Sequence, residues 1–365
     1  GAILNNANTI TNTQLGGFVA GNPNLVGGTA RVILNEVNSS NPSLLRGYIE
    51  VGGNSAQVIV ANPSGITCDG CGFINANRAT LTTGTPILNG GSLDGYLVQR
   101  GAITIQGAGL DASQSGFTDI IARAVQVNAG IFAQELKITA GANQVSADHG
   151  QITPVAGIGD APAFAIDVAQ LGGMYANKIL LIGTEAGVGV RNAGMIGASA
   201  GEVFVTVDGR IENSGTITSS SQLRATTQSQ LSNSGTIAAL SDVALSAANI
   251  DNTLGTIAAS GTLDSKSGAL INDAGLIQAT GAANIDTNGQ LLTNTNSGAN
   301  GGLFSQSTLT LNTGALDNGA GVIGALGNLS ANSGAIDNTN GAISSARETT
   351  LSGTSLDNGG GQIQA

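Results

Sequence analysis

The sequence predicts an all-β protein: a right-handed parallel β-helix with about 20 residues per coil and extra-helical hairpins or loops in its N-terminal part. Three observations predict this fold. A pattern returns every 20 residues in the second half, apolar positions alternate between its copies, and the 365 residues include 56 glycines and no tryptophan. A fixed period of this length indicates a solenoid, in which each repeat stacks on its neighbours.

The repeated pattern reads apolar–x–Asn, a few polar residues, and then Gly–x–Ile. Its glycines are Gly215, Gly235, Gly255 and Gly275, followed after a six-residue insertion by Gly301, Gly321, Gly341 and Gly361. Between the copies a second apolar pair recurs with a spacing of two, as at Val243 and Leu245, which is the periodicity of a strand. Glycine and asparagine tolerate the left-handed backbone that sharp corners need. We therefore interpret each 20-residue unit as one coil.

Composition limits the classes of partner and environment. The net charge is −11, which argues against nucleic acid or an anionic membrane as a partner. No stretch approaches 18 consecutive apolar residues, so no transmembrane helix is predicted. All six prolines precede residue 163, as expected if every coil of the repeats donates the hydrogen bonds of its ladder.

The N-terminal part alternates short apolar runs with turn signals. Three Asn-Pro steps begin at Asn22, Asn41 and Asn62. The Asn side chain bonds the backbone ahead of it and proline fixes φ near −65°, so each step predicts a rigid turn. An excursion or loop is expected at Asp148–Gly150 and over the stretch Pro154–Pro162. Strands are expected at Arg31–Val37, Tyr48–Val51, Gln57–Val60, Ala102–Gln106, Asp119–Val127, Glu135–Ala140, Lys178–Ile182 and Glu202–Val207.

Two of these turns carry a family resemblance. The segments 22–25 (NPNL) and 62–66 (NPSGI) resemble the paired NPNL and NPNGI signatures of two-partner secretion exoproteins, the filamentous-haemagglutinin-like adhesins and contact-dependent growth inhibition proteins of Gram-negative bacteria. The residues concerned are Asn22, Pro23, Asn24, Leu25, Asn62, Pro63, Ser64, Gly65 and Ile66. The second signature departs from the family at Ser64. Further similar phrases are RVILNEV at 31–37, TCDGCGF at 67–73, LTTGTP at 81–86, GAGLD at 107–111 and DVAQLGGMYANK at 167–178.

The resemblance implies a secretion domain at residues 1–210 and 20-residue haemagglutinin repeats at residues 211–365. It also implies that the chain is an N-terminal fragment of a large secreted or cell-surface exoprotein. An outer-membrane transporter of the Omp85 type, a β-barrel with periplasmic POTRA domains, would recognise it and export it through the periplasm. The whole protein would then form a β-helical filament for adhesion or contact-dependent toxin delivery, meeting its target-cell receptor or host surface through regions beyond this fragment.

Two smaller expectations accompany that resemblance. The chain is expected to be a monomer. The family's secretion domain usually opens with further residues before a segment like Ile3–Asn6, so the N-terminal cap of the helix is expected to be incomplete here.

The only cysteines, Cys68 and Cys71, form the motif Cys-Asp-Gly-Cys. A zinc site needs about four ligands, and His149 is the sole histidine. A thioredoxin-like redox site would need a βαβ context. A local disulfide that closes a glycine-containing turn fits a secreted protein best. So small a loop removes little chain entropy, so it would pin a turn rather than hold up the fold.

No motif in the chain points to an enzyme, a cofactor or a metal. Asp148 and His149 are adjacent, but neighbouring residues on a strand point apart, which argues against a catalytic pair. Asp317, Asp337 and Asp357 share one register, and a carboxylate ladder of this kind could bind calcium. We expect these carboxylates to face solvent instead, while the asparagines that follow each of them turn inward and bond the corner backbone.

A different function class is a β-helix polysaccharide lyase or glycosidase. Such sites gather acids and bases on one long face, whereas the last 150 residues contain only Arg224, Lys266 and Arg347 as bases. A third class, an ice- or surface-binding protein with flat threonine ladders, is disfavoured because the threonine register is irregular. The favoured interpretation is a secreted protein without catalytic activity.

Overall fold

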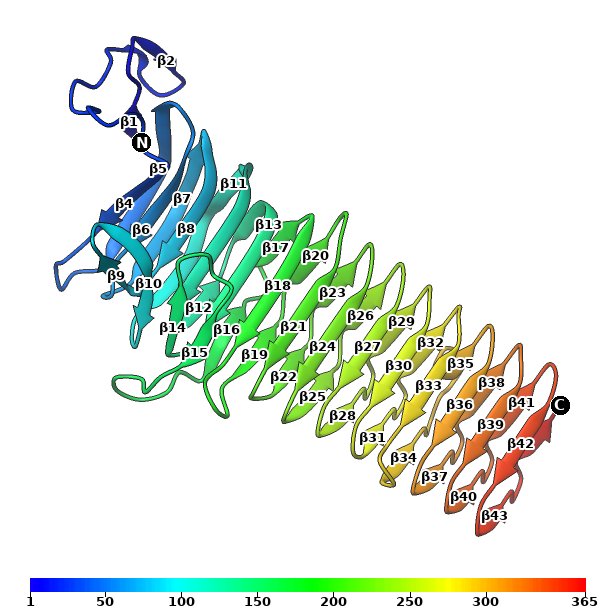
Figure 1. Ribbon diagram of the computed structural model, residues 1–365. Helices are drawn as coiled ribbons and strands as arrows, with labels where there is room; N and C mark the ends of the chain where they lie inside the picture. Colours follow the sequence, from blue (N-terminus) through cyan, green and yellow to red (C-terminus); the bar gives the residue numbers. More distant parts are fainter. The chain divides into compact units, whose positions relative to one another are not determined.

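The computed structural model describes residues 1–365 and consists of strands and turns without a helix (Figure 1). No helix long and apolar enough to cross a membrane is therefore present. The chain divides into two compact units, Gly1–Met195 and Ile196–Ala365. Each unit is built from strands that pair in parallel with the equivalent strands one coil away. The predicted all-β parallel solenoid is confirmed.

The first unit contains strands of very unequal length. They are β1 (Ala2–Asn6), β2 (Thr11–Thr13), β3 (Gly17–Val19), β4 (Val32–Glu36), β5 (Ser43–Gly53), β6 (Ala56–Ala61), β7 (Ile66–Ile74), β8 (Ala76–Thr82), β9 (Thr85–Asn89), β10 (Ser92–Val98), β11 (Ala102–Ala122), β12 (Ala124–Val127), β13 (Gly130–Ala140), β14 (Asn143–Ser146), β15 (Ile152–Pro154), β16 (Phe164–Val168), β17 (Gly173–Ala176), β18 (Lys178–Gly183) and β19 (Gly189–Asn192). The 21-residue β11 pairs with β7 through its first half and with β8 through its second half. One strand therefore turns a corner of the solenoid.

Antiparallel strands lie outside the coils of this unit, as expected. The hairpin β2–β3 is one such element, and β9, β10, β14 and β15 form a separate four-stranded sheet. Apolar side chains of that sheet, including Tyr96, Val98 and Val145, are fully buried against Ile59 and Ile121 of the coils. Of the segments expected to be an excursion or loop, only Pro154 lies in a strand, at the end of β15.

One expected strand is shorter than the sequence predicts. The run Asp119–Val127 breaks at Arg123, between β11 and β12. The buried Arg123 guanidinium turns to bind Glu185 at 2.7 Å and the Ile158 carbonyl at 2.7 Å. The chain therefore turns a corner at Arg123, although the hydropathy pattern predicts one unbroken strand. The local sequence does not show the distant partners that bind the arginine side chain.

The second unit has three short strands in each coil, and each occupies one of three stacks (Figure 1). The strands are β20 (Met195–Ala198), β21 (Val203–Val207), β22 (Ile211–Asn213), β23 (Thr216–Ser219), β24 (Leu223–Thr227), β25 (Gln230–Asn233), β26 (Thr236–Ala239), β27 (Val243–Ser246), β28 (Asn249–Asp251), β29 (Thr256–Ala259), β30 (Leu263–Lys266), β31 (Leu270–Ile271), β32 (Leu276–Ala279), β33 (Ala283–Asp286), β34 (Leu291–Thr293), β35 (Gly302–Ser305), β36 (Leu309–Asn312), β37 (Ala315–Asp317), β38 (Val322–Ala325), β39 (Leu329–Asn332), β40 (Ala335–Asp337), β41 (Ala342–Ser345), β42 (Thr349–Ser352), β43 (Ser355–Asp357) and β44 (Gln362–Gln364). The isoleucines of the Gly–x–Ile pattern, such as Ile237, Ile257 and Ile277, stack in register in the core.

The repeat asparagines form a continuous ladder inside this unit. Each side-chain amide donates to the side-chain oxygen of the next asparagine at 2.7–2.8 Å. The members are Asn213, Asn233, Asn252, Asn272, Asn294, Asn318, Asn338 and Asn358. Spacings of 22 and 24 residues around Asn294, against 19 or 20 elsewhere, show that the six-residue insertion is divided between two corners.

Candidate functional site

The Asn-Pro turn of the second signature, which begins at Asn62, joins β6 to β7 and is fixed by that fully buried asparagine. The Asn62 side-chain oxygen accepts a hydrogen bond from the Ser64 backbone N–H at 2.9 Å. Its amide donates to the Asn41 carbonyl at 3.0 Å and to the Ser43 hydroxyl at 2.9 Å. The Asn62 backbone N–H donates to the Thr82 carbonyl at 2.9 Å. One residue thus closes its own turn and links it to the preceding and following coils.

The first Asn-Pro turn repeats this geometry in a more exposed place. The Asn22 side-chain oxygen accepts from the Asn24 backbone N–H at 3.0 Å, and its amide donates to the Asn5 carbonyl at 3.0 Å. Its backbone N–H donates to the Ala7 carbonyl at 2.7 Å. Pro23 and Asn24 are exposed, whereas Pro63 and Ser64 are half-buried. The two motifs are therefore the same kind of tethered corner.

The structure does not bring the two motifs together. Asn22 is bonded to Asn5, which pairs with Gly52 near the end of β5. Asn62 is bonded to Ser43, the first residue of β5. The strand has 11 residues and its register against β7 shifts between Leu45 and Gly47, so the two motif asparagines lie at most roughly 30 Å apart. The two motifs occupy different corners of the folded unit.

The departure from the family signature at Ser64 has a local explanation. The Ser64 hydroxyl donates to the Ser39 carbonyl at 3.1 Å, and the Ser64 backbone N–H is held by Asn62. A short polar side chain satisfies this corner, so serine keeps the turn formed.

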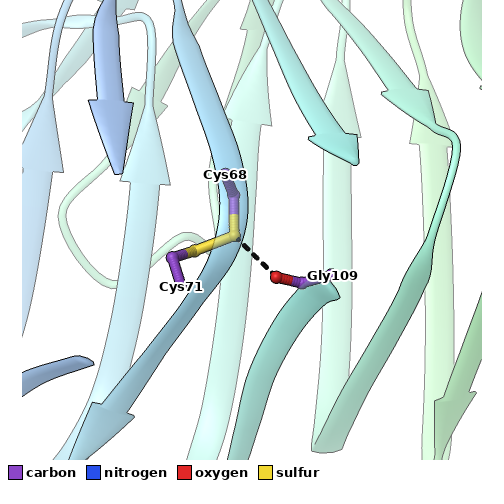
Figure 2. Close-up of a disulfide and its surroundings, with 3 residues drawn as sticks. All are labelled: Cys68, Cys71 and Gly109. Carbon is purple, nitrogen blue, oxygen red and sulfur yellow. Dashed lines mark hydrogen bonds between the residues drawn. A yellow bond between two sulfur atoms is a disulfide. The ribbon is translucent and has the colours of Figure 1, made fainter. Parts of the chain in front are cut away.

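Cys68 and Cys71 are joined by a disulfide across a corner within β7 (Figure 2). Their sulfur atoms lie 1.94 Å apart and their Cα atoms 5.3 Å apart. Both residues are buried, and the Cys68 sulfur lies 3.2 Å from the Gly109 carbonyl oxygen of a neighbouring coil (the dashed line in Figure 2). Gly70, between the two cysteines, has a φ of +71°, a conformation that glycine adopts without strain. The disulfide therefore clamps a tight corner.

Neighbouring coils show what the disulfide replaces. Cys68 and Cys71 pair in register with Ile105 and Leu110 of β11. Those positions continue to Val127 and Ile131 in the following coil, and all four of these apolar residues are buried. The same corner is closed by packed apolar side chains in one coil and by a covalent bond in another.

Replacing both cysteines with alanine is expected to lower the free energy of unfolding of the first unit by about 2 kcal/mol, the constraint expected from closing so small a loop. The double variant Cys68→Val/Cys71→Leu is expected to lose less, because it restores the apolar pair of the neighbouring coils. Urea unfolding, monitored by tyrosine fluorescence, measures the stability of both variants. The signal reports on the first unit because all three tyrosines lie before residue 196. The assignment would be contradicted if the double alanine variant had the same free energy of unfolding as the wild type. Two free thiols in oxidised protein would also contradict it.

His149 pairs with a distant aspartate rather than with its neighbour Asp148. Its Nδ1 lies 2.8 Å from Asp119 Oδ1 and 3.0 Å from an Arg78 guanidinium nitrogen. Burial raises the pKa of Asp119, but hydrogen bonds from His149 and Arg78 outweigh it and hold that pKa below its usual range. Lys137 donates to the His149 carbonyl at 2.5 Å. His149 is 1% exposed, and the cluster fixes the β14–β15 turn to the coils.

The aspartates of the repeats close turns. The Oδ1 atoms of Asp317, Asp337 and Asp357 each accept a backbone N–H two residues ahead, at 2.8–3.0 Å. Hydrogen bonds from the Thr339 hydroxyl and N–H lower the pKa of Asp337. The asparagines that follow these aspartates turn inward, as expected, and Asn318 and Asn338 are fully buried. No group of three or more His, Cys, Asp or Glu side chains is arranged to hold a metal ion.

Sequence reasoning missed two buried acids that organise the first unit. Glu50 is 4% exposed and accepts the backbone N–H groups of Gln14 and Leu15 at 2.7 Å. Asp119 is 2% exposed and holds Arg78 and His149. An isolated acid in an apolar run was the only available signal, and it does not identify the partner.

Comparisons with known proteins match both parts of the chain. The family model described as TPS secretion domain, for two-partner secretion, matches residues 1–217, and the haemagglutinin repeat matches 198–292, 278–346 and 327–365. A toxin CdiA of Yersinia pestis is 62% identical over 224 residues, 61% of this chain and 7% of that protein. A tRNA nuclease CdiA-2 of Burkholderia pseudomallei is 51% identical over 217 residues, 59% of this chain and 7% of that protein.

A crystal structure of a filamentous haemagglutinin secretion domain is also similar, with a TM-score of 0.48 and 29% identity over 80% of this chain and 82% of that one. The chain thus spans a small fraction, 7%, of the curated relatives described above. Exoproteins with such domains are secreted or displayed at the cell surface, and the same holds for this chain. The two matches together cover the whole of residues 1–365, and the chain belongs to the two-partner secretion domain family, with haemagglutinin repeats following that domain.

Proposed function

We propose that residues 1–210 are the module by which a cognate outer-membrane transporter selects this chain for export, and that residues 211–365 begin its repeat region. The observation that carries this proposal is the match of the secretion-domain family over residues 1–217, together with 62% identity to a CdiA toxin in the same region. Several relatives bear nuclease names, but the matched part is only 6–7% of their length. This part of the chain therefore acts as a non-enzymatic export and display element of a contact-dependent toxin system.

The geometry supports a folding-coupled export mechanism. A single coil cannot bury its faces, so folding propagates from coils already formed. Asn62 ties its turn to residues before it and after it, so its coil becomes stable only together with its neighbours. The chain passes through the transporter in an extended form and folds coil by coil outside the cell. Each folded coil then disfavours backward movement of the chain through the transporter. The transporter's periplasmic POTRA domains, on this view, meet the chain before its corners close.

The alternative of a β-helix polysaccharide lyase or glycosidase finds no support. The relatives that match are described as toxins and nucleases, and the family model that matches residues 1–217 is a secretion domain. The acid–histidine pair of Asp119 and His149 is buried, with side chains 3% and 1% exposed, and it anchors a turn.

Export from a Gram-negative host tests the proposal. The chain, carrying a secretory signal peptide, is produced with its cognate transporter, with an unrelated transporter of the same class, or with none. We expect protein in the medium or at the cell surface only with the cognate transporter. Residues 196–365 alone serve as the matched control and are expected to stay in the periplasm. Equal export of that control, or export without any transporter, would contradict the proposal.

A further inference from the structure

The disulfide between Cys68 and Cys71 closes a corner whose length differs from coil to coil. The pairs of residues in register with the two cysteines are Leu45 and Gly47 in β5, and Ile105 and Leu110 in β11. One residue lies between the members of the β5 pair, two lie between the cysteines, and four lie between the members of the β11 pair. Corners of unequal length give no repeating spacing that fixes which residues meet, and a slip of one residue turns inward side chains outward. The covalent bond therefore fixes the register where the sequence has no period.

Both sulfur atoms are covered once the first unit has folded. Cys68 is 0% exposed and Cys71 is 3% exposed. The Cys68 sulfur lies 3.2 Å from the carbonyl oxygen of Gly109, which belongs to β11 (Figure 2). Thiol–disulfide exchange requires direct contact between the sulfur atoms of the two reacting molecules. A protein oxidant can therefore form this bond only before β11 packs over it.

The same bond is compatible with a chain that is still unfolded. It joins residues only three positions apart, so it ties no distant segments together and leaves the chain on both sides free to extend. It holds the two Cα atoms at 5.3 Å, whereas three steps of extended chain span about 10 Å. An unfolded chain that contains this disulfide therefore carries the corner already bent.

We propose that Cys68 and Cys71 are the substrate of a periplasmic dithiol oxidase that acts on the unfolded chain, and that the chain enters the transporter with this corner preformed. The inference rests on the proposed export function, in which coils form only outside the cell. One cysteine thiolate attacks the disulfide of the oxidase, forms a mixed disulfide and releases one oxidase thiol. The second thiolate displaces the other oxidase sulfur. Two electrons and two protons thus pass from the cysteine pair to the two thiols of the oxidase.

Outside the cell the preformed corner aligns two strand pairs at once. Strand β7 pairs with β5 on one side and with β11 on the other. Its register against both strands shifts at this corner, so a fixed corner sets both registers on each side of the bend. An oxidised chain is therefore expected to complete the first unit more readily than a reduced chain.

The thiol state of the chain before and after export tests this order of events. The chain, with a signal peptide, is produced with or without its cognate transporter, in hosts that have or lack the periplasmic dithiol oxidase. Samples are quenched in acid, denatured and labelled with a maleimide of known mass. We expect no label on the chain held in the periplasm of the oxidase-containing host without the transporter. In the host without the oxidase we expect two labels and, with the transporter, a loss of protease-resistant protein outside the cell.

Cys68→Val/Cys71→Leu is the matched control, because it has no thiols and carries an apolar pair like that of β11. Its export is expected to be the same in both hosts, and a loss equal to that of the wild type would show that the oxidase acts on another protein and overturn the proposal. Two labels on the wild-type chain in the oxidase-containing periplasm, with a disulfide appearing only outside the cell, would also overturn it. Undiminished export of the reduced wild type would exclude a role for the preformed corner.

The periplasmic measurement separates this proposal from the export function on which it rests. It is made without the transporter and on the wild-type sequence, so it decides when the disulfide forms even if a variant fails to fold. Failure of the wild type to leave the oxidase-containing host with its cognate transporter would instead contradict the proposed function.

Discussion

Replacing Gly321 with alanine is expected to destabilise the coils around it by at least about 3 kcal/mol, the range of substitutions that force severe overlap. A Cβ atom at this position would overlap the carbonyl oxygen of Asn294 and the side-chain oxygen of Asn318. Neither atom is free to move, since the Asn294 amide donates to that Asn318 oxygen at 2.7 Å and both residues are buried in the ladder. The methyl group must therefore break either the corner or the ladder.

Gly319→Ala is the matched control in the same turn. A Cβ atom there approaches nothing closer than Asp317 Oδ1, at 3.2 Å, so its stability is expected to stay within about 0.5 kcal/mol of the wild type. Urea unfolding by circular dichroism measures both variants, and hydrogen exchange locates the loss. The tyrosine signal, which comes only from the first unit, should be unchanged. Similar stability of both variants would show that the corner relaxes around the added methyl group.

The repeats could be predicted from sequence because each position of the repeat has the same structural role in every coil. Gly321 and Gly341 recur where a side chain would strike the coil beneath, and Asn318 and Asn338 recur where a ladder amide is needed. Residues with the same structural role therefore recur at a fixed spacing in the sequence. The two-residue alternation then assigns the inward positions without any tertiary information.

The first unit was harder to predict because its contacts follow no period. Asp119 and His149 are 30 positions apart and meet only because β14 and β15 fold outside the coils. Arg123 interrupts a strand and forms a hydrogen bond with Glu185, which lies 62 residues later in the sequence. The role of Cys68 and Cys71 as a substitute for an apolar pair depends on their register with β11. Single-sequence patterns carry no information on which irregular segments become neighbours.

Replacing Asn62 with alanine is expected to have the largest effect on the first unit. The change removes two donated hydrogen bonds and one accepted bond, and leaves the Asn41 carbonyl, the Ser43 hydroxyl and the Ser64 N–H short of partners. Because Asn62 is fully buried, water cannot replace those bonds at no cost. We expect a loss of about 2–4 kcal/mol in the free energy of unfolding and reduced secretion.

The equivalent change at the other turn is the natural comparison. Asn22→Ala removes one donated and one accepted side-chain bond in a half-buried place, so solvent compensates part of the loss and about 1 kcal/mol is expected. Ser64→Asn restores the family signature and should leave stability nearly unchanged. If the turns act by supporting the first coils, secretion should fall in the order of these stability losses, with Asn62→Ala lowest.

The competing account makes the Asn-Pro turns a contact surface for the transporter. The placement of the two motifs near opposite ends of β5 and the burial of Asn62 disfavour it for the folded domain. Two measurements on each variant separate the accounts: tyrosine-detected unfolding, and binding to the transporter's isolated periplasmic domains. We expect Asn62→Ala to unfold earlier and to bind those domains as the wild type does. If it unfolds like the wild type yet fails to bind, the structural account is wrong and the motif is a contact site.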